Sequence, residues 1–88
     1  MSGGHFDYAY QRVQNFADDL ESQLGEYDEN SEMYDALRAV MITSRYTARM
    51  MKAAEWLYSG DIGEDTFIDR LGAIITEMEQ TSYELNDE

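Results

Sequence analysis

Three stretches of the chain repeat apolar residues every three or four positions, which is the spacing of one helix face. They predict helices over residues 7–24 and 32–58 and a third helix after Gly63. No stretch alternates apolar and polar residues as a strand does. Because both connections are short, the predicted fold is all-α, a three-helix up-down-up bundle with a long central helix.

Residues with strong end preferences flank these stretches. We expect Gly25 to end the first helix in the left-handed conformation and Gly60 to end the second. Ser31 or Asn30 can cap the start of the second helix with a side-chain oxygen. Asp61 and Glu64 have the spacing of a capping box at the start of the third.

The central helix is predicted to have two unlike faces. Four of the six basic residues of the chain fall within about 60° of one another around its axis. They are Arg38, Arg45, Arg49 and Lys52, which we call the basic stripe. Opposite the stripe lie Met33, Ala36, Val40, Thr47, Met51, Ala54 and Tyr58. Further apolar residues on the two flanks are Leu37, Ala39, Tyr46, Ala48, Met50 and Leu57. A broad apolar face of this kind is expected to pack against both neighbouring helices.

Composition describes one small domain spanning residues 1–88. We expect residues 1–6 to form a flexible N-terminal stem and residues 80–88 a frayed acidic tail. The chain has no cysteine, which fits a reducing compartment, and no apolar run long enough to span a bilayer. No secretory signal precedes the first helix. These features predict a cytoplasmic protein.

Charge is sorted unevenly along the sequence. Residues 32–58 carry a net charge of +1, the remaining residues carry −14, and the chain carries −13. This charge repels nucleic acid and anionic membranes at long range, so neither is an expected partner. A host protein with a basic surface is a better candidate, as is a second copy of the chain.

Residue types that carry catalysis are scarce. The only histidine, His5, precedes the first predicted helix and has no partner fixed in position. No metal-ligand motif, phosphate-binding glycine loop or nucleophile motif occurs. The sequence predicts a non-catalytic protein with no metal and no cofactor.

The basic stripe has two interpretations. Its cations can pair with neighbouring acids, such as Asp35, Glu55 and side chains of the flanking helices, and cover a solvent face. Alternatively, the stripe is a self-association or anion-binding surface, because Tyr34 and Trp56 lie near the same line with Met41 and Ile42. Arginines and aromatic residues are frequent in interface cores.

The acids also have two interpretations. A cluster lies at the end of the first helix and in the loop that follows it. Its members, together with a neighbouring tyrosine, are Asp18, Asp19, Glu21, Glu26, Tyr27, Asp28 and Glu29. They can be ordinary solubility charges, or a partner-binding array that mimics a phosphate backbone and occupies a basic groove.

Two short segments support a resemblance. The chain begins Met-Ser-Gly-Gly-His-Phe, with Tyr8 close behind, and residues 59–64 read Ser-Gly-Asp-Ile-Gly-Glu, followed by Phe67 and Arg70. In these features it resembles a family of small proteins encoded by bacteriophages and prophages. Aspartate is usual in that family where this chain has Ile62. The resemblance implies a phage origin and a protein that antagonises host defence by stoichiometric binding.

The leading functional hypothesis is therefore a non-catalytic inhibitor of a host defence or nucleic-acid-handling complex, similar to anti-CRISPR or anti-restriction proteins, with the acidic cluster as a nucleic-acid mimic. A second hypothesis is an oligomeric sponge that captures an anionic nucleotide signal with Arg45, Arg49 and Lys52. A third is a structural or regulatory phage homodimer without a host target.

Overall fold

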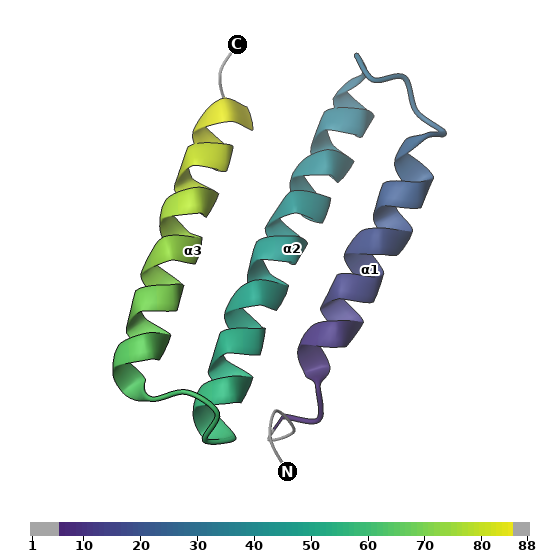
Figure 1. Ribbon diagram of the computed structural model, residues 1–88. Helices are drawn as coiled ribbons and strands as arrows, with labels where there is room; N and C mark the ends of the chain where they lie inside the picture. Colours follow the sequence, from purple (N-terminus) through teal and green to yellow (C-terminus); the bar gives the residue numbers. More distant parts are fainter. Residues whose placement is uncertain (1–5, 86–88) are drawn as a thin grey trace.

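The computed structural model describes residues 6–85, with side chains up to Thr81. It consists of α1 (Ala9–Leu24), α2 (Glu32–Tyr58) and α3 (Glu64–Leu85), which run alternately up and down (Figure 1). No strand occurs among these residues. The predicted all-α class and long central helix are confirmed. The backbone is still helical from residue 80 to Leu85, within the predicted tail.

The three helices lie side by side in one layer (Figure 1). α2 contacts both α1 and α3, whereas the described parts of α1 and α3 do not contact each other. The Cα atoms extend 44 × 25 × 10 Å, and their radius of gyration is 15.1 Å. A compact domain of this length has a radius of about 12 Å. The chain is therefore flatter than a bundle in which each helix packs against the other two.

Small residues allow α2 to approach its neighbours closely. Ala17 of α1 and Ala48 of α2 are both 0% exposed, and Leu24 and Met41 extend this cluster along the α1 side. On the α3 side, Ala53 and Ile74 are buried. There the Tyr46 hydroxyl also lies 2.9 Å from the Thr81 hydroxyl. The core is thus two narrow seams on opposite sides of one helix.

The predicted buried face of α2 is wrong at its centre. Met33 and Val40, both directed away from the basic stripe, are 50% and 46% exposed. The flanks of the predicted face make the seams instead, with Ala48 toward α1 and Tyr46 toward α3. The physical reason is that α1 and α3 flank α2 on opposite sides, so neither covers the middle of its apolar arc.

The ends of the helices agree only partly with expectation. Ser31 caps α2 by accepting a hydrogen bond from the Tyr34 amide at 3.1 Å, as predicted. Gly25 is right-handed (φ −62°), so its predicted left-handed role is wrong, whereas Gly60 has φ 85° after the end of α2. Because α3 begins at Glu64, its N-cap position is Gly63, and Asp61 lies two residues too early to cap it.

A buried glutamate fixes the segment before α1. Glu55 is 1% exposed, and its Oε2 accepts the backbone amides of Phe6 at 2.8 Å and Tyr8 at 3.3 Å. The Phe6 ring lies edge-on to Tyr58, with 5.5 Å between ring centroids. Asp7 and Tyr8 adopt left-handed backbone angles, which is why α1 starts at Ala9 and not at the predicted Asp7. Phe6 is thus packed against α2, while the rest of the predicted stem, with His5, lies outside the described residues.

Candidate functional site

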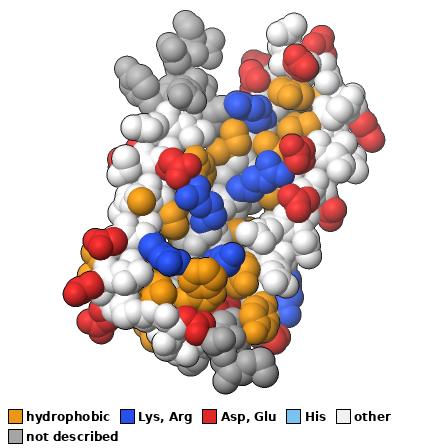
Figure 2. All heavy atoms as spheres, in the orientation of Figure 1, with side chains coloured by type: hydrophobic (Ala, Val, Ile, Leu, Met, Phe, Trp, Pro, Cys, Tyr) orange, Lys and Arg blue, Asp and Glu red, His pale blue; other side chains and the backbone are white. Residues whose placement is uncertain are grey.

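The basic residues gather on one side of the layer, which we call the front face. Figure 2 shows lysine and arginine side chains along the middle of this face, with acids mainly toward its edges. The basic stripe contributes four of them, because α2 is one unbroken helix from Glu32 to Tyr58. Arg70 of α3 adds a fifth cation beside Trp56.

Two cations of the stripe bind acids of the neighbouring helices. Arg45 donates to Glu21 at 2.7 Å and to Asp18 at 3.0 Å, and Arg49 donates to Glu77 at 3.0 and 3.3 Å. The hydrogen bond from Arg49 holds the pKa of Glu77 below its usual value. These pairs tie both outer helices to α2, and they leave Arg45 and Arg49 less available to an outside anion.

Lys52 and Arg70 are held differently. The Lys52 ammonium lies 5.0 Å and the Arg70 guanidinium 5.1 Å from the centroid of the Trp56 ring. Lys52 also lies 5.7 Å from the Tyr10 ring. Among the described residues, neither cation has a carboxylate within ion-pair distance. An aromatic face attracts a cation but leaves its charge unneutralised, so Trp56 positions two cations that can still bind an anion.

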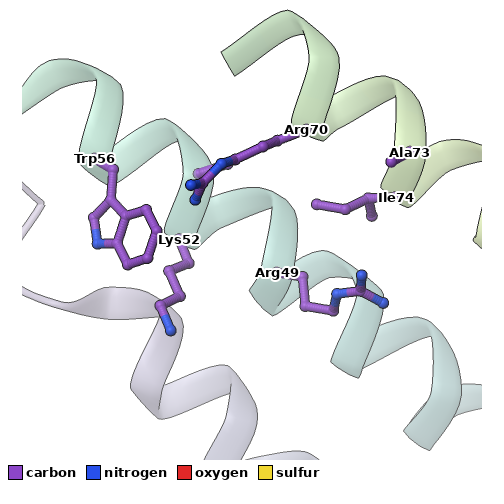
Figure 3. Close-up of a pocket in the computed structure, with 7 residues that line it drawn as sticks. Arg49, Lys52, Trp56, Arg70, Ala73 and Ile74 are labelled. Carbon is purple, nitrogen blue, oxygen red and sulfur yellow. The ribbon is translucent and has the colours of Figure 1, made fainter. Parts of the chain in front are cut away.

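These side chains border an open pocket between α2 and α3. Its volume is about 320 Å³, and its other lining residues are Arg49, Ala53, Ala73 and Ile74. In Figure 3, Arg70 reaches from α3 toward the Trp56 indole, while the Arg49 guanidinium points away from it. The pocket therefore combines two available cations at the indole with an apolar wall formed by Ala73 and Ile74.

The members of the predicted acidic cluster have different surroundings in the structure. Asp18 and Glu21 pair with Arg45, as described above. Asp28 organises the loop, because its Oδ1 accepts the Asn30 amide at 3.0 Å and its carbonyl accepts the Ser31 hydroxyl at 2.7 Å. The other predicted members are exposed: Asp19, Glu26, Tyr27 and Glu29.

A second pocket, of about 370 Å³, lies at the end of the layer that holds this loop. Tyr27, Glu29, Tyr34 and Arg38 are among its lining residues. Arg38 is exposed and makes no ion pair with a described residue. The structure thus separates the predicted self-association or anion-binding residues. Arg38 and Tyr34 line one pocket, Arg49, Lys52 and Trp56 line the other, and Arg45 lines neither of the two.

Sequence reasoning missed two residues of importance. Arg70 was noted only for its place in a motif, because nothing in the sequence shows that α3 brings it against Trp56. Glu55 was expected on the surface as an acid available to the stripe, yet it is buried and holds the N-terminal segment. Only Glu55 could have been identified from the sequence. It is an acid toward the apolar flank of a helix, and such an acid requires hydrogen-bond partners when it is buried.

Other types of site find no support in the described part of the chain. No group of three or more histidine, cysteine, aspartate or glutamate side chains there could hold a metal ion. No helix within residues 6–85 is both long and apolar enough to cross a membrane.

Comparison with protein-family models, curated proteins and solved structures finds no match for this chain. The resemblance to phage proteins therefore stays a prediction.

Proposed function

We propose that the protein is a non-catalytic binding protein that captures an anionic small molecule of the nucleotide class in the pocket beside Trp56. The observation that carries this proposal is that Lys52 and Arg70 share the Trp56 ring and have no carboxylate partner. The proposal modifies the second hypothesis from the sequence, the nucleotide sponge, by replacing its predicted set of cations with Lys52 and Arg70. Arg45 takes no part in it, because Asp18 and Glu21 occupy its guanidinium.

The pocket suits a ligand with two unlike parts. A phosphate can accept charge-assisted hydrogen bonds from Lys52 and Arg70. A base or sugar can lie against Ala73 and Ile74, which line the same pocket. Its volume falls at the lower end of the range for small-molecule sites, which is about 300–1,000 Å³.

The overall charge of −13 does not prevent this binding. The Debye length is about 8 Å at physiological ionic strength, so acids at the far edges of the layer are largely screened at the pocket. Arg49, which lines the pocket, already pairs with the carboxylate of Glu77.

Calorimetry with four probes tests the proposal: cyclic adenosine monophosphate, adenosine 5′-monophosphate, inorganic phosphate and adenosine. We expect saturable binding of at least one nucleotide, and weaker binding of phosphate and of adenosine alone. Arg70→Gln should weaken nucleotide binding about tenfold or more, because one charged hydrogen bond contributes about 1.5–3 kcal/mol.

Arg38→Gln provides the matched control. It removes the same charge from the front face, but at the other pocket, and should leave nucleotide affinity within about twofold. Absence of binding heat with both nucleotides, or equal weakening by the two variants, would exclude this site.

Inhibition of a host complex through acidic mimicry is the second candidate. Asp19, Glu26 and Glu29 are exposed, and Glu29 lines a pocket together with Tyr27, which favours this candidate. Replacing these three acids with Asn or Gln spares the two acids bound to Arg45. The variant should lose capture of a basic host protein from a bacterial lysate while keeping its melting temperature. Unchanged capture would end this candidate.

A further inference from the structure

The side of the layer opposite the basic stripe, which we call the back face, is apolar on α2. Around this helix, its residues lie within about 50° of the direction opposite the stripe. They include Met33, Ala36, Val40, Thr47, Met51 and Ala54, and the one charged residue of α2 in this range is Glu32, the first residue of the helix.

Both outer helices continue this face. Residues two positions apart in a helix point in nearly opposite directions, about 160° apart. Asp18, Arg70 and Glu77 make the front-face contacts described above. Phe16, Ile68 and Ile75, each two positions before one of them, therefore belong to the back face. Phe16 is 51% and Ile68 63% exposed.

The amount of exposed surface is too large for a compact monomer. The accessible surface of the chain is 6188 Å², and its mass is 10.2 kDa. A folded monomer of this mass exposes about 5,300 Å². The excess, roughly 900 Å², is close to the ~800 Å² that each partner buries in a stable protein complex.

We infer that the back face is the interface of a homodimer, in which two layers pack back to back. A second copy fits because the surface is complementary to itself. Small residues, Ala36, Thr47 and Ala54, follow the middle line of this face on α2, and larger ones, Met33, Val40 and Met51, lie along one side of that line. On a twofold axis the flanking side chains of each copy can fill the groove over the small residues of the other.

This arrangement completes the fold as a two-layer structure. One layer of helices leaves one side of each apolar stripe in water, and a second layer covers it. The two front faces then point outward, so each dimer presents two copies of the pocket beside Trp56. The dimer differs from self-association through the basic stripe, which would cover that pocket.

Salt distinguishes the two dimers. On α2 the proposed interface carries only Glu32, at the end of the helix, and each chain carries −13, so added salt screens repulsion between the copies and tightens the dimer. A dimer built from the basic stripe and acids of the partner would weaken instead. Sedimentation equilibrium of the unaltered protein at 0.05 and 0.5 M sodium chloride measures this.

The variant Val40→Glu/Ile68→Glu tests the face directly. Both side chains are largely exposed in the single layer, so the substitutions should leave its helix content unchanged by circular dichroism. Burying four carboxylates per dimer should raise the dimer dissociation constant by about 100-fold or more. The control Gln11→Glu/Gln80→Glu adds the same charge at exposed positions outside the back face and should dimerise like the unaltered protein.

We expect a dimer of twice the chain mass whose dissociation constant is lower at high salt. Only Val40→Glu/Ile68→Glu should abolish this dimer. A 10.2 kDa species at all concentrations up to 100 µM would overturn the inference. So would a dimer that weakens with salt, or one that both variants retain. The salt series needs no substitution, so the inference is tested even if a variant fails to fold.

Discussion

The front and back faces of this layer differ in whether their side chains find partners within the single chain. On the front face, cations bind acids of the neighbouring helices or rest on an aromatic ring, as Arg45 and Lys52 illustrate. On the back face, Val40 is 46% and Ile68 is 63% exposed within the single chain. A charged side chain can find a partner through one hydrogen bond or ion pair beside the helix, whereas an apolar side chain leaves water only when another surface packs over it. This contrast is the basis for proposing a binding site on the front face and a homodimer interface on the back face.

The largest expected effect concerns Glu55, which fixes the N-terminal segment beside Tyr58 at one end of the back face. Glu55→Ala should lower the free energy of unfolding by about 3 kcal/mol, because it removes the acceptor of two backbone amides. Urea denaturation measures the change. Glu55→Gln keeps one acceptor oxygen and should cost less. Equal losses in the two variants would show that packing, and not hydrogen bonding, is the contribution of this residue.

The next effect concerns the front face. Trp56→Leu removes the ring that positions Lys52 and Arg70, and should weaken nucleotide binding about tenfold, since two cation–π contacts contribute roughly 0.5–1 kcal/mol each. Calorimetry with adenosine 5′-monophosphate gives the affinity, and sedimentation gives the oligomeric state. The dimer should persist. Loss of both together would mean that the two faces are not independent.

A smaller effect follows from coupling between folding and assembly on the back face. The melting temperature of the unaltered protein should rise with its concentration, because dimerisation stabilises the folded chain by mass action. A tenfold increase in concentration corresponds to about 0.7 kcal/mol per chain, or half of the 1.4 kcal/mol that a factor of ten represents. Calorimetric scans at 10 and 100 µM would detect this rise. Val40→Glu/Ile68→Glu should melt at one temperature at both concentrations.

The smallest effect is the pH dependence of the Arg49–Glu77 pair on the front face. Since this bond lowers the pKa of folded Glu77, its contribution is complete above the usual glutamate value of about 4.5. It is lost as the pH falls through the lowered value, because the folded carboxylate then becomes protonated. The melting temperature of the unaltered protein minus that of Glu77→Gln should shrink toward zero over this range. A difference independent of pH would show that the pair adds no stability.

The sequence by itself determined the helices and the sorting of charge along α2. The Ser31 cap is a contact between residues three apart, and the basic stripe follows from the helical repeat of α2. Both are local, so they form however the helices pack against one another. The pocket was predictable only in part, since Lys52 and Trp56 are neighbours within one helix.

Only the tertiary structure decided which part of the apolar arc of α2 is buried. The arc could be covered at its centre by two neighbouring helices that also contact each other, or only at its flanks by helices on opposite sides of α2. Both arrangements require the same spacing of apolar residues in the sequence, so the sequence does not distinguish them. The packing of α1 and α3 on opposite sides of α2 also brings Arg70 to Trp56 and pairs Asp18 with Arg45. It buries Glu55 under the N-terminal segment. These pairs join residues 14 to 49 positions apart, so their formation depends on how whole helices pack and not on any local pattern.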